Sequence, residues 1–390
     1  MNSIRMGIIG IGNMGTSHAK NLYEGKVKGA VLTAICDTNM ERIEWARDYF
    51  DDSVFIYNSF ESMIEAHVVD ALIIATPHYS HPELGIKTLE ANLHVLVEKP
   101  IGVYTQAVEK LNDVAAKSEQ VFTIMYNQRT LPIYQKVKEL IVNGEIGELI
   151  RVNWIMTTWF RSQYYYDSGG WRATWEGEGG GVLLNQCPHQ IDLLQWLCGM
   201  PVRVRSFCDY GKYHEIEVED DVTAFFEYEN GATGVFITST GEAPGTNRLE
   251  ISGEYGNIVV ENNSIVFRKN ADSVFEHSKI VQEGFKQPEC NEIPIHTEGE
   301  GKDHIGIMED FIETIQAKQQ GIVVEQLSPG IEGIKGLTLS NAIHMSSWKN
   351  EWVTIPFDNI EFKELLQDKI RNSCVKKEEK SIVIDVNGSH

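Results

Sequence analysis

The stretch Met6-Gly7-Ile8-Ile9-Gly10-Ile11-Gly12-Asn13-Met14-Gly15 lies near the start of this 390-residue chain. Its apolar first half predicts a short buried strand, and residues 14–22 have the composition of a helix. Gly10, Gly12 and Gly15 stand between them at the spacing G-x-G-x-x-G. In such a turn the first glycine permits the bend, the second lets the backbone approach a pyrophosphate, and the third lets the helix pack on the strand. An ordinary glycine turn is the alternative, but the strand and helix on either side favour a dinucleotide site. The expected cofactor contacts in this turn are Gly10, Gly12, Asn13 and Met14.

A carboxylate follows the second expected strand. Residues 31–36 are apolar, and Asp37 comes directly after them, 22 positions beyond Gly15. A carboxylate at this place accepts hydrogen bonds from the adenosine ribose diol of NAD and repels the 2′-phosphate of NADP. Asp37 therefore favours NAD, although Arg42 would weaken that preference if it turned toward the site.

Strands and helices alternate through the first 126 residues. Further strands are expected at 54–57, 69–76, 94–97 and 121–125, and helices at 40–49, 59–66, 82–91 and 104–118. Several strands are apolar on both faces, which predicts a parallel sheet covered on both sides. Ligands of such sheets bind beyond the carboxyl ends of the strands. We therefore predict an α/β, doubly wound Rossmann domain over residues 1–126, with Thr76, Glu98, Lys99, Tyr126 and Asn127 at strand ends.

The pattern becomes β-rich after residue 127. A helix at 133–142 precedes expected strands at 149–159, 202–208, 222–228, 233–240, 248–253 and 257–260. Residues 269–302 are polar and predict a loop with one or two short strands, and amphipathic helices follow at 304–316, 330–348 and 362–370. We predict a second, α+β domain over residues 127–372 with a large, mostly antiparallel open sheet. Residues 373–390 form a charged tail, in which 383–386 could add an edge strand.

Composition excludes several classes of protein. The formal net charge of −22 argues against a nucleic-acid partner, and no apolar run reaches the length of a membrane span. The first strand begins too early to leave room for a signal peptide. The six cysteines show neither a C-x-x-C pair nor zinc spacing, so we expect free thiols in a reducing compartment and no metal site. A cytoplasmic protein with a small-molecule substrate is the expectation.

Two clusters carry the candidate chemistry. Lys99, in Glu98-Lys99-Pro100, is either a surface loop residue or an ammonium directed at a substrate hydroxyl with its pKa lowered by burial. The second cluster is the run 179–192, which begins with three glycines. If it is helical, Asn185 and His189 lie along one face; otherwise His189 is a core residue and the glycines form a turn. Pro188 would either kink that helix or mark its true N-terminus.

Residues 159–172 are dense in aromatic and polar side chains. Aromatic faces can stack on the C–H faces of pyranose rings, while arginine and amide side chains bind hydroxyls. Arg161 and Tyr164 are the candidate sugar contacts in this stretch. A loop that packs its rings on the sheet is the alternative, and it must hold for some of them.

Taken together, these motifs resemble the Gfo/Idh/MocA oxidoreductase family, which includes glucose–fructose oxidoreductase and inositol dehydrogenase. The resemblance rests on the glycine turn, on Thr76-Pro77 with His81 after it, on Glu98-Lys99-Pro100 and on a Gly-Gly-x-x-x-Asx-x-x-x-His pattern ending at His189. It implies that Lys99 and His189 flank the reacting carbinol beside the nicotinamide, and that His189, with Lys99 close by, accepts the hydroxyl proton. The implied cofactor contacts are Thr76, Pro77, His81, Glu98, Lys99, Asn127, Trp171 and Arg172. The implied substrate contacts are Tyr126, Arg129, Arg161, Tyr164, Asn185 and His189.

Asn185 departs from the family pattern, which usually has aspartate there. An aspartate would hold the histidine tautomer and stabilise its cation, whereas asparagine supplies no charge. Lys99 would then carry more of the proton transfer, or Asn185 would bind a substrate hydroxyl.

The resemblance is greatest to members that oxidise glycosides or levoglucosan at the 3-hydroxyl. It implies NAD-dependent oxidation of a sugar to a keto-sugar, in a homo-oligomer. An inositol dehydrogenase, an NAD-dependent glycosidase acting through transient oxidation, and a non-catalytic sugar or NAD sensor are the alternatives.

Overall fold

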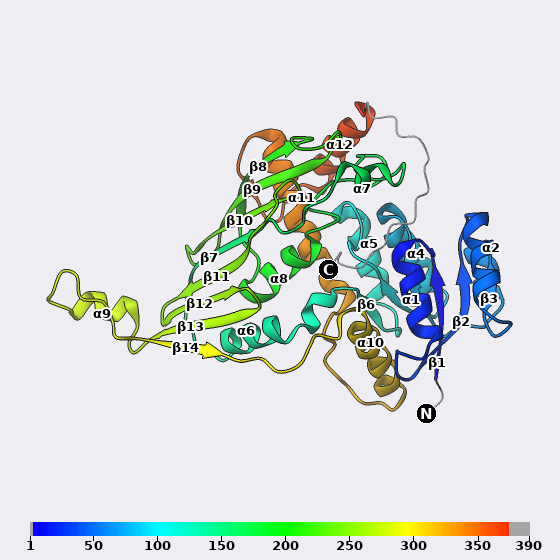
Figure 1. The fold of residues 1–390 in the computed structure, drawn as a ribbon, viewed down its shortest axis with the longest axis horizontal. Helices are drawn as coiled ribbons and strands as arrows, with labels where there is room; N and C mark the ends of the chain where they lie inside the picture. The colour runs from blue at the N-terminus through cyan, green and yellow to red at the C-terminus, as the bar shows by residue number, and fades with distance from the viewer. Residues whose placement is uncertain (1–2, 374–390) are drawn as a thin grey trace.

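The computed structural model describes residues 3–373 and contains two β-sheets with helices packed around them (Figure 1). The first sheet is parallel, with the strand order β3-β2-β1-β4-β5-β6. This is the order of a doubly wound dinucleotide-binding fold, as predicted. Its strands are β1 (Ile4–Ile9), β2 (Ala30–Cys36), β3 (Phe55–Tyr57), β4 (Ala71–Ile74), β5 (His94–Val97) and β6 (Phe122–Ile124).

The helices that connect the strands of the first sheet begin close to the expected positions. They are α1 (Asn13–Tyr23), α2 (Met40–Tyr49), α3 (Phe60–Glu65), α4 (His81–Glu90) and α5 (Thr105–Ala115), with short 3₁₀ turns η1 (His78–Ser80) and η2 (Asn127–Thr130). Ser59 caps α3 by accepting a hydrogen bond from the Ser62 N–H.

The second sheet has the strand order β14-β13-β12-β11-β7-β10-β9-β8-β15, and only the β7–β10 pair in it is parallel. Most of its strands alternate buried and more exposed residues, because helices cover one face only. The strands are β7 (Leu149–Met156), β8 (Arg203–Tyr210), β9 (Glu219–Glu227), β10 (Thr233–Ser239), β11 (Asn247–Gly253), β12 (Gly256–Glu261), β13 (Ser264–Asn270), β14 (Cys290–Ile295) and β15 (Val353–Thr354).

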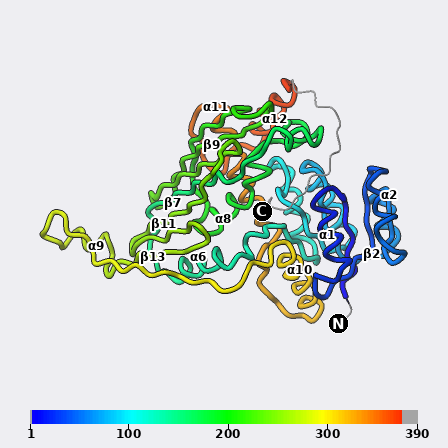
Figure 2. Tube along the Cα trace, in the orientation of Figure 1, coloured from blue at the N-terminus to red at the C-terminus, as the bar shows by residue number. Residues whose placement is uncertain are grey.

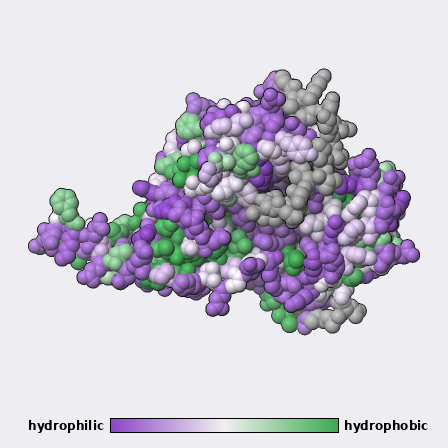
Figure 3. All heavy atoms as spheres, viewed as in Figure 1, coloured by the Kyte–Doolittle hydropathy of each residue, from purple (hydrophilic) through white to green (hydrophobic). Residues whose placement is uncertain are grey.

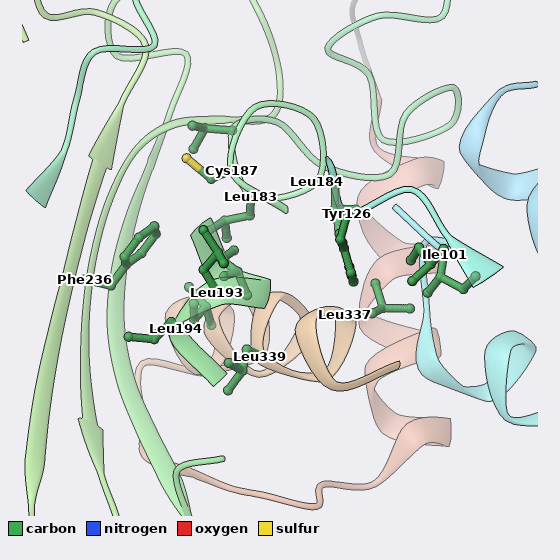
Figure 4. Close-up of a cluster of buried hydrophobic side chains, with 14 of the residues drawn as sticks. Ile101, Tyr126, Leu183, Leu184, Cys187, Leu193, Leu194, Phe236, Leu337 and Leu339 are labelled. Atoms are coloured by element: carbon green, nitrogen blue, oxygen red, sulfur yellow. The ribbon is translucent and has the colours of Figure 1, made fainter. Parts of the chain in front are cut away.

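Helices α8 and α11 lie between the two sheets and share their core. Figure 4 shows Leu193 of α8 and Leu337 of α11 between Phe236 of the second sheet and Ile101 beyond β5. This continuous apolar contact holds the segment before α8 against the strand ends of the first sheet. The helices of this part are α6 (Pro132–Val142), α7 (Gln163–Asp167), α8 (Pro188–Cys198), α9 (Val274–Ile280), α10 (Asp303–Gln319), α11 (Gly333–Lys349) and α12 (Asn359–Arg371), with the 3₁₀ turn η3 (Gly330–Glu332) before α11.

The C-terminal half departs from expectation at β13 and β15, which were not expected, and at the packing of α10 and the segment that contains α9. Helix α10 buries Ile307, Phe311 and Ile315 in the same core as Met6 and Ile8, so it packs on the first sheet although it follows the second in sequence. The polar segment after β13 contains α9, which has no buried residue and projects from the body of the molecule (Figure 2). The short strand expected at 383–386 lies outside the described residues. Within 3–373, each helix is too short or too polar to cross a membrane.

Candidate active site

The glycine turn at the start of α1 has the shape that a dinucleotide needs. Gly10 has φ +85°, and a Cβ there would lie 2.8 Å from the Ala75 carbonyl oxygen. A Cβ on Gly15 would come within 1.8 Å of the Gly10 carbonyl oxygen, so only glycine lets α1 pack this closely. Gly12 faces open space and begins α1 without a side-chain cap. The first N–H groups of α1, at Asn13 and Met14, are therefore available to a pyrophosphate.

Asp37 lies beside this turn at the carboxyl end of β2. Its Oδ2 accepts the Ile11 N–H at 2.7 Å, and its Oδ1 accepts the Asn39 N–H at 2.8 Å. The half-buried carboxylate is thus held next to the turn and is partly open. This arrangement fits the adenosine ribose of NAD.

We expect Asp37→Asn to weaken NAD binding by about 10- to 100-fold, since hydrogen bonds to charged groups contribute roughly 1.5–3 kcal/mol. The preference for NAD over NADP should fall as well, because the charge that repels the 2′-phosphate is lost. Fluorescence titration with both nucleotides measures this, with the exposed Asp48→Asn as a charge-matched control. An NAD dissociation constant equal to that of the control would show that Asp37 does not contact the ribose.

Glu98 and His81 hold the strand ends in place. Glu98 Oε1 lies 2.6 Å from His18 Nε2 on α1, and its Oε2 accepts the Lys99 N–H at 3.0 Å. Burial raises the pKa of Glu98, but the His18 contact and nearby positive charge outweigh it and lower the pKa to about 2. The ring nitrogens of His81 lie 2.7 Å from the Pro100 oxygen and 2.6 Å from the Thr76 oxygen. Both side chains, which were expected to contact the cofactor, thus form hydrogen bonds with the backbone just after β4 and β5. Pro77, also expected at the cofactor, is exposed.

Lys99 joins the first sheet to the second half of the chain. Its half-buried side chain donates from Nζ to the Asn185 carbonyl oxygen at 2.8 Å. Burial lowers the pKa of Lys99, and the negative charges of Glu98 and Glu178 oppose this shift. Lys99 follows β5, and the Glu98 side chain that precedes it is bonded to His18 of α1, the helix that follows the glycine turn.

The segment before α8 is a turn, so of the two alternatives for Pro188 the structure shows the true helix N-terminus, and Asn185 lies outside the helix that carries His189. Helix α8 begins at Pro188, whose ring suits the first helical position. The Gly181 and Leu183 N–H groups both donate to Glu219 Oε1, at 2.8 and 3.1 Å, which holds the turn in place. His189 is the second residue of α8 and is buried.

Asn185 is bonded to two residues that the sequence did not single out. Its Nδ2 donates to the Glu178 carboxylate, and its Oδ1 accepts from the Tyr165 hydroxyl at 3.3 Å. Tyr165 in turn accepts from Arg172 Nη1 at 2.9 Å and from Gln186 Nε2 at 3.3 Å. The sequence signals were weak: Tyr165 is one of three consecutive tyrosines, and Glu178 directly precedes the glycine run.

Some side chains of residues 159–172 are packed in the core, and others lie around Tyr165. Trp159 and Tyr166 are buried, as the packing alternative requires. The Arg161 guanidinium lies 5.2 Å from the centre of the Tyr165 ring, and the Arg172 guanidinium lies 4.7 Å from the Tyr165 and Trp171 rings. Tyr164 is 62% exposed, and its neighbour Tyr165 makes the contacts with Asn185 and Arg172.

Arg129 and Tyr126, both expected to contact the substrate, form their hydrogen bonds within the protein. Arg129 is 1% exposed; it donates twice to Asp192 at 2.8 Å and once to Glu332 at 2.7 Å. Burial would lower the pKa of Arg129, but these carboxylates outweigh it and raise the pKa. The buried Tyr126 hydroxyl donates to the Gly333 oxygen at 3.4 Å, and its ring packs edge-on against His189 with centroids 6.2 Å apart. Both polar groups are therefore used inside the protein.

Two amide side chains near these residues each have a buried oxygen atom without a hydrogen-bond partner in the described part of the chain. Asn127 Oδ1 and Gln186 Oε1 have no hydrogen-bond partner within residues 3–373. Folded proteins leave few buried polar atoms unpaired. Asn127 follows β6 at the carboxyl edge of the first sheet, and Gln186 adjoins Asn185.

Comparison with known proteins agrees with this geometry. Residues 4–126 match a family model described as an oxidoreductase family with an NAD-binding Rossmann fold, and residues 134–259 match a GFO/IDH/MocA C-terminal domain. The chain is 26% identical to myo-inositol 2-dehydrogenase of Thermotoga maritima, over 66% of this chain and 75% of that protein. It is 25% identical to levoglucosan dehydrogenase of Pseudarthrobacter phenanthrenivorans, over 91% and 99% respectively.

Solved structures show the same architecture. The WlbA dehydrogenase from Bordetella pertussis, in complex with NADH and UDP-GlcNAcA, superposes with a TM-score of 0.75 at 25% identity, over 92% of this chain and all of that one. A levoglucosan dehydrogenase in complex with NADH and L-sorbose has a TM-score of 0.72 at 21% identity, over 92% and all of the respective chains, and shares the fold. The two family models cover more than half of the sequence, and the glycine turn and Asp37 fit their cofactor. The chain therefore belongs to the GFO/IDH/MocA oxidoreductase family and is an NAD-dependent enzyme.

Proposed function

We propose that this enzyme oxidises a secondary hydroxyl, the 3-hydroxyl, of a pyranose sugar or glycoside to a keto-sugar. The observation that carries the proposal is the contact between Lys99 Nζ and the Asn185 carbonyl oxygen at the end of β5. It supports the proposal because it joins a lysine at a strand end of the first sheet to the amide-rich segment before α8. The levoglucosan dehydrogenase relative, which matches over 91% of the chain, supports a sugar substrate.

Proton transfer falls to the side chains around Lys99. NAD, when bound, takes the hydride from the carbinol carbon. Lys99 accepts the hydroxyl proton, and because burial lowers its pKa, more of it is neutral near pH 7 than of an exposed lysine. The Asn185 carbonyl oxygen fixes the position of Nζ, and His189, packed against Tyr126, flanks the same carbinol.

Sugar recognition is assigned to the polar network over this site. Gln186 Oε1 is free to accept a hydrogen bond from a hydroxyl, and Arg161 and Arg172 lie over the Tyr165 ring. A ring polyol offers the same groups as a pyranose. Inositol oxidation is therefore the second candidate, supported by the myo-inositol 2-dehydrogenase of Thermotoga maritima and the scyllo-inositol 2-dehydrogenase of Bacillus subtilis, 26% and 25% identical.

A panel of pyranosides, anhydrosugars and inositols with NAD tests the proposal. We expect NADH absorbance and a product lighter by two hydrogens with a pyranose, and mass fragmentation that locates the ketone at the 3-position. Turnover of inositols alone would favour the second candidate. Aglycone released without NADH would indicate a glycosidase, and NAD binding without any turnover would indicate a sensor; either result would refute the proposal.

We propose that the protein is a cytoplasmic homo-oligomer that associates through the outer face of the nine-stranded sheet. The strands of this sheet alternate buried residues with more exposed ones, so one face is more open than the face that packs on α8 and α11. Apolar side chains also reach the surface near β11 and β13 (Figure 3). Ile155 and Phe207 of this sheet are exposed at 36% and 63%. The buried free thiols Cys36, Cys187 and Cys208 suit a reducing compartment.

Phe207→Glu should dissociate the oligomer, because it introduces a charge into the proposed apolar contact. Light scattering after size exclusion measures the mass, with the exposed Phe275→Glu on α9 as a control. An unchanged mass in Phe207→Glu would place the interface elsewhere.

A further inference from the structure

Glu178 is a buried carboxyl group without an ion-pair partner. Its side chain is only 2% exposed. Oε2 accepts the Ala173 N–H at 2.6 Å, and Oε1 accepts the Asn185 amide. Among residues 3–373, no lysine, arginine or histidine is within ion-pair distance of this carboxylate. A buried acid is costly unless it is paired, so this one needs an explanation.

The backbone around Glu178 is shaped to hold it. Ala173 has φ +52°, a left-handed conformation that costs a residue with a Cβ about 1 kcal/mol or more. That conformation aims its N–H at Glu178. The Glu178 carbonyl oxygen lies 3.2 Å from His78 Nδ1, which follows β4. Strained backbone of this kind persists where the surrounding structure fixes it, and it gathers at functional sites.

Asn185 connects Glu178 to Lys99. Its side chain bonds the Glu178 carboxylate, and its carbonyl oxygen accepts from Lys99 Nζ. One neutral residue therefore separates the Glu178 carboxyl group from the Lys99 ammonium. Burial raises the pKa of Glu178, while the charge of Arg172 and the bonds from Ala173 and Asn185 favour its ionised form. The other charged groups around Lys99 are Glu98, bonded to His18, and Arg161 and Arg172, stacked on aromatic rings; Arg172, Glu219 and His78 also surround Glu178.

We propose that Glu178 is a positioning residue of the proton-transfer site: it orients Asn185, and its negative charge stabilises the ammonium form of Lys99. The use of this charge in catalysis rests on the function proposed above, whereas the coupling between the two side chains does not. In the reaction the hydroxyl proton moves to Lys99 and the hydride leaves with NAD. Glu178 takes up no proton and balances the charge that Lys99 acquires.

The pH midpoint of Lys99 acetylation by acetic anhydride, followed by peptide mass spectrometry, tests the coupling without any substrate. Glu178→Gln should lower the midpoint by about one pH unit, the size expected of a charge several ångströms away at an effective dielectric constant near 20. The exposed Glu176→Gln is the matched control. The double variant Glu178→Gln/Asn185→Asp moves the negative charge from position 178 to position 185. Its midpoint should return toward that of the original protein. An unchanged midpoint in folded Glu178→Gln overturns the proposal.

Lys99→Met supplies the test if Glu178→Gln does not fold. Without the ammonium, the carboxylate of Glu178 keeps Arg172 but loses the positive charge of Lys99, so its pKa rises further in the folded state. Stability is then lost as the pH rises from the pKa of the unfolded carboxyl to that of the folded one. The melting temperature of Lys99→Met should therefore fall below that of the original protein by more at neutral than at mildly acidic pH. A difference independent of pH overturns the proposal, and absence of sugar turnover bears only on the proposed function.

Discussion

Replacing Lys99 with methionine is expected to lower kcat for sugar oxidation by about 10²- to 10⁴-fold, the range that a positioned acid or base contributes. Methionine keeps the length of the side chain but cannot accept a proton. NAD binding should stay within a few-fold, because the glycine turn and Asp37 do not depend on Nζ. Steady-state kinetics and nucleotide titration measure the two effects, with the exposed Lys110→Met as a control.

The pH profile gives this prediction a second readout. Only neutral Lys99 accepts the hydroxyl proton, so oxidation should rise with pH through its pKa. Burial lowers that pKa, so the rise should lie below the value of 10.5 that is usual for lysine. The rise should vanish in Lys99→Met. A folded variant with near-normal kcat and the same profile would show that another group takes the proton.

Replacing His189 with asparagine should lower kcat by a similar factor of about 10²–10⁴. The imidazole is the second group that flanks the carbinol, and its ring is fixed by the edge of Tyr126 at the start of α8. Because both residues act on one proton transfer, the double variant with Lys99→Met should be little slower than the slower single variant. The exposed His296→Asn serves as the control.

Additive losses in the double variant would contradict a shared step. Normal turnover in His189→Asn would make His189 a core residue, the alternative that its burial in α8 allows.

The sequence predicts the first sheet and its cofactor turn well because both depend on local patterns. Only glycine satisfies the positive φ of Gly10 and the close approach at Gly15, so these positions can be recognised from the sequence alone. Asp37 can also be recognised from the sequence, because it follows a buried strand at a fixed distance from the turn. Fold class, cofactor and family are accordingly confirmed.

The site was less predictable where long-range partners decide a role. Nothing local indicates that Arg129 pairs with Asp192, 63 positions away, or that Tyr126 bonds α11. Glu219, on a strand distant in sequence, holds the segment before α8 as a turn. Helical spacing alone therefore could not decide whether Asn185 lies in the same helix as His189. Tyr165 and Glu178 enter the network for the same reason: their partners meet only in the folded chain.

The account depends on a lysine from the first sheet and a histidine from α8 acting on one alcohol. A crystal structure of the enzyme with NADH and the sugar that the substrate panel identifies tests this most directly. We predict that the reacting oxygen lies within hydrogen-bond distance of both Lys99 Nζ and the His189 ring, with its carbon facing the nicotinamide. An oxygen that contacts neither side chain, or a sugar bound with the two on opposite sides of the cleft, would contradict the account.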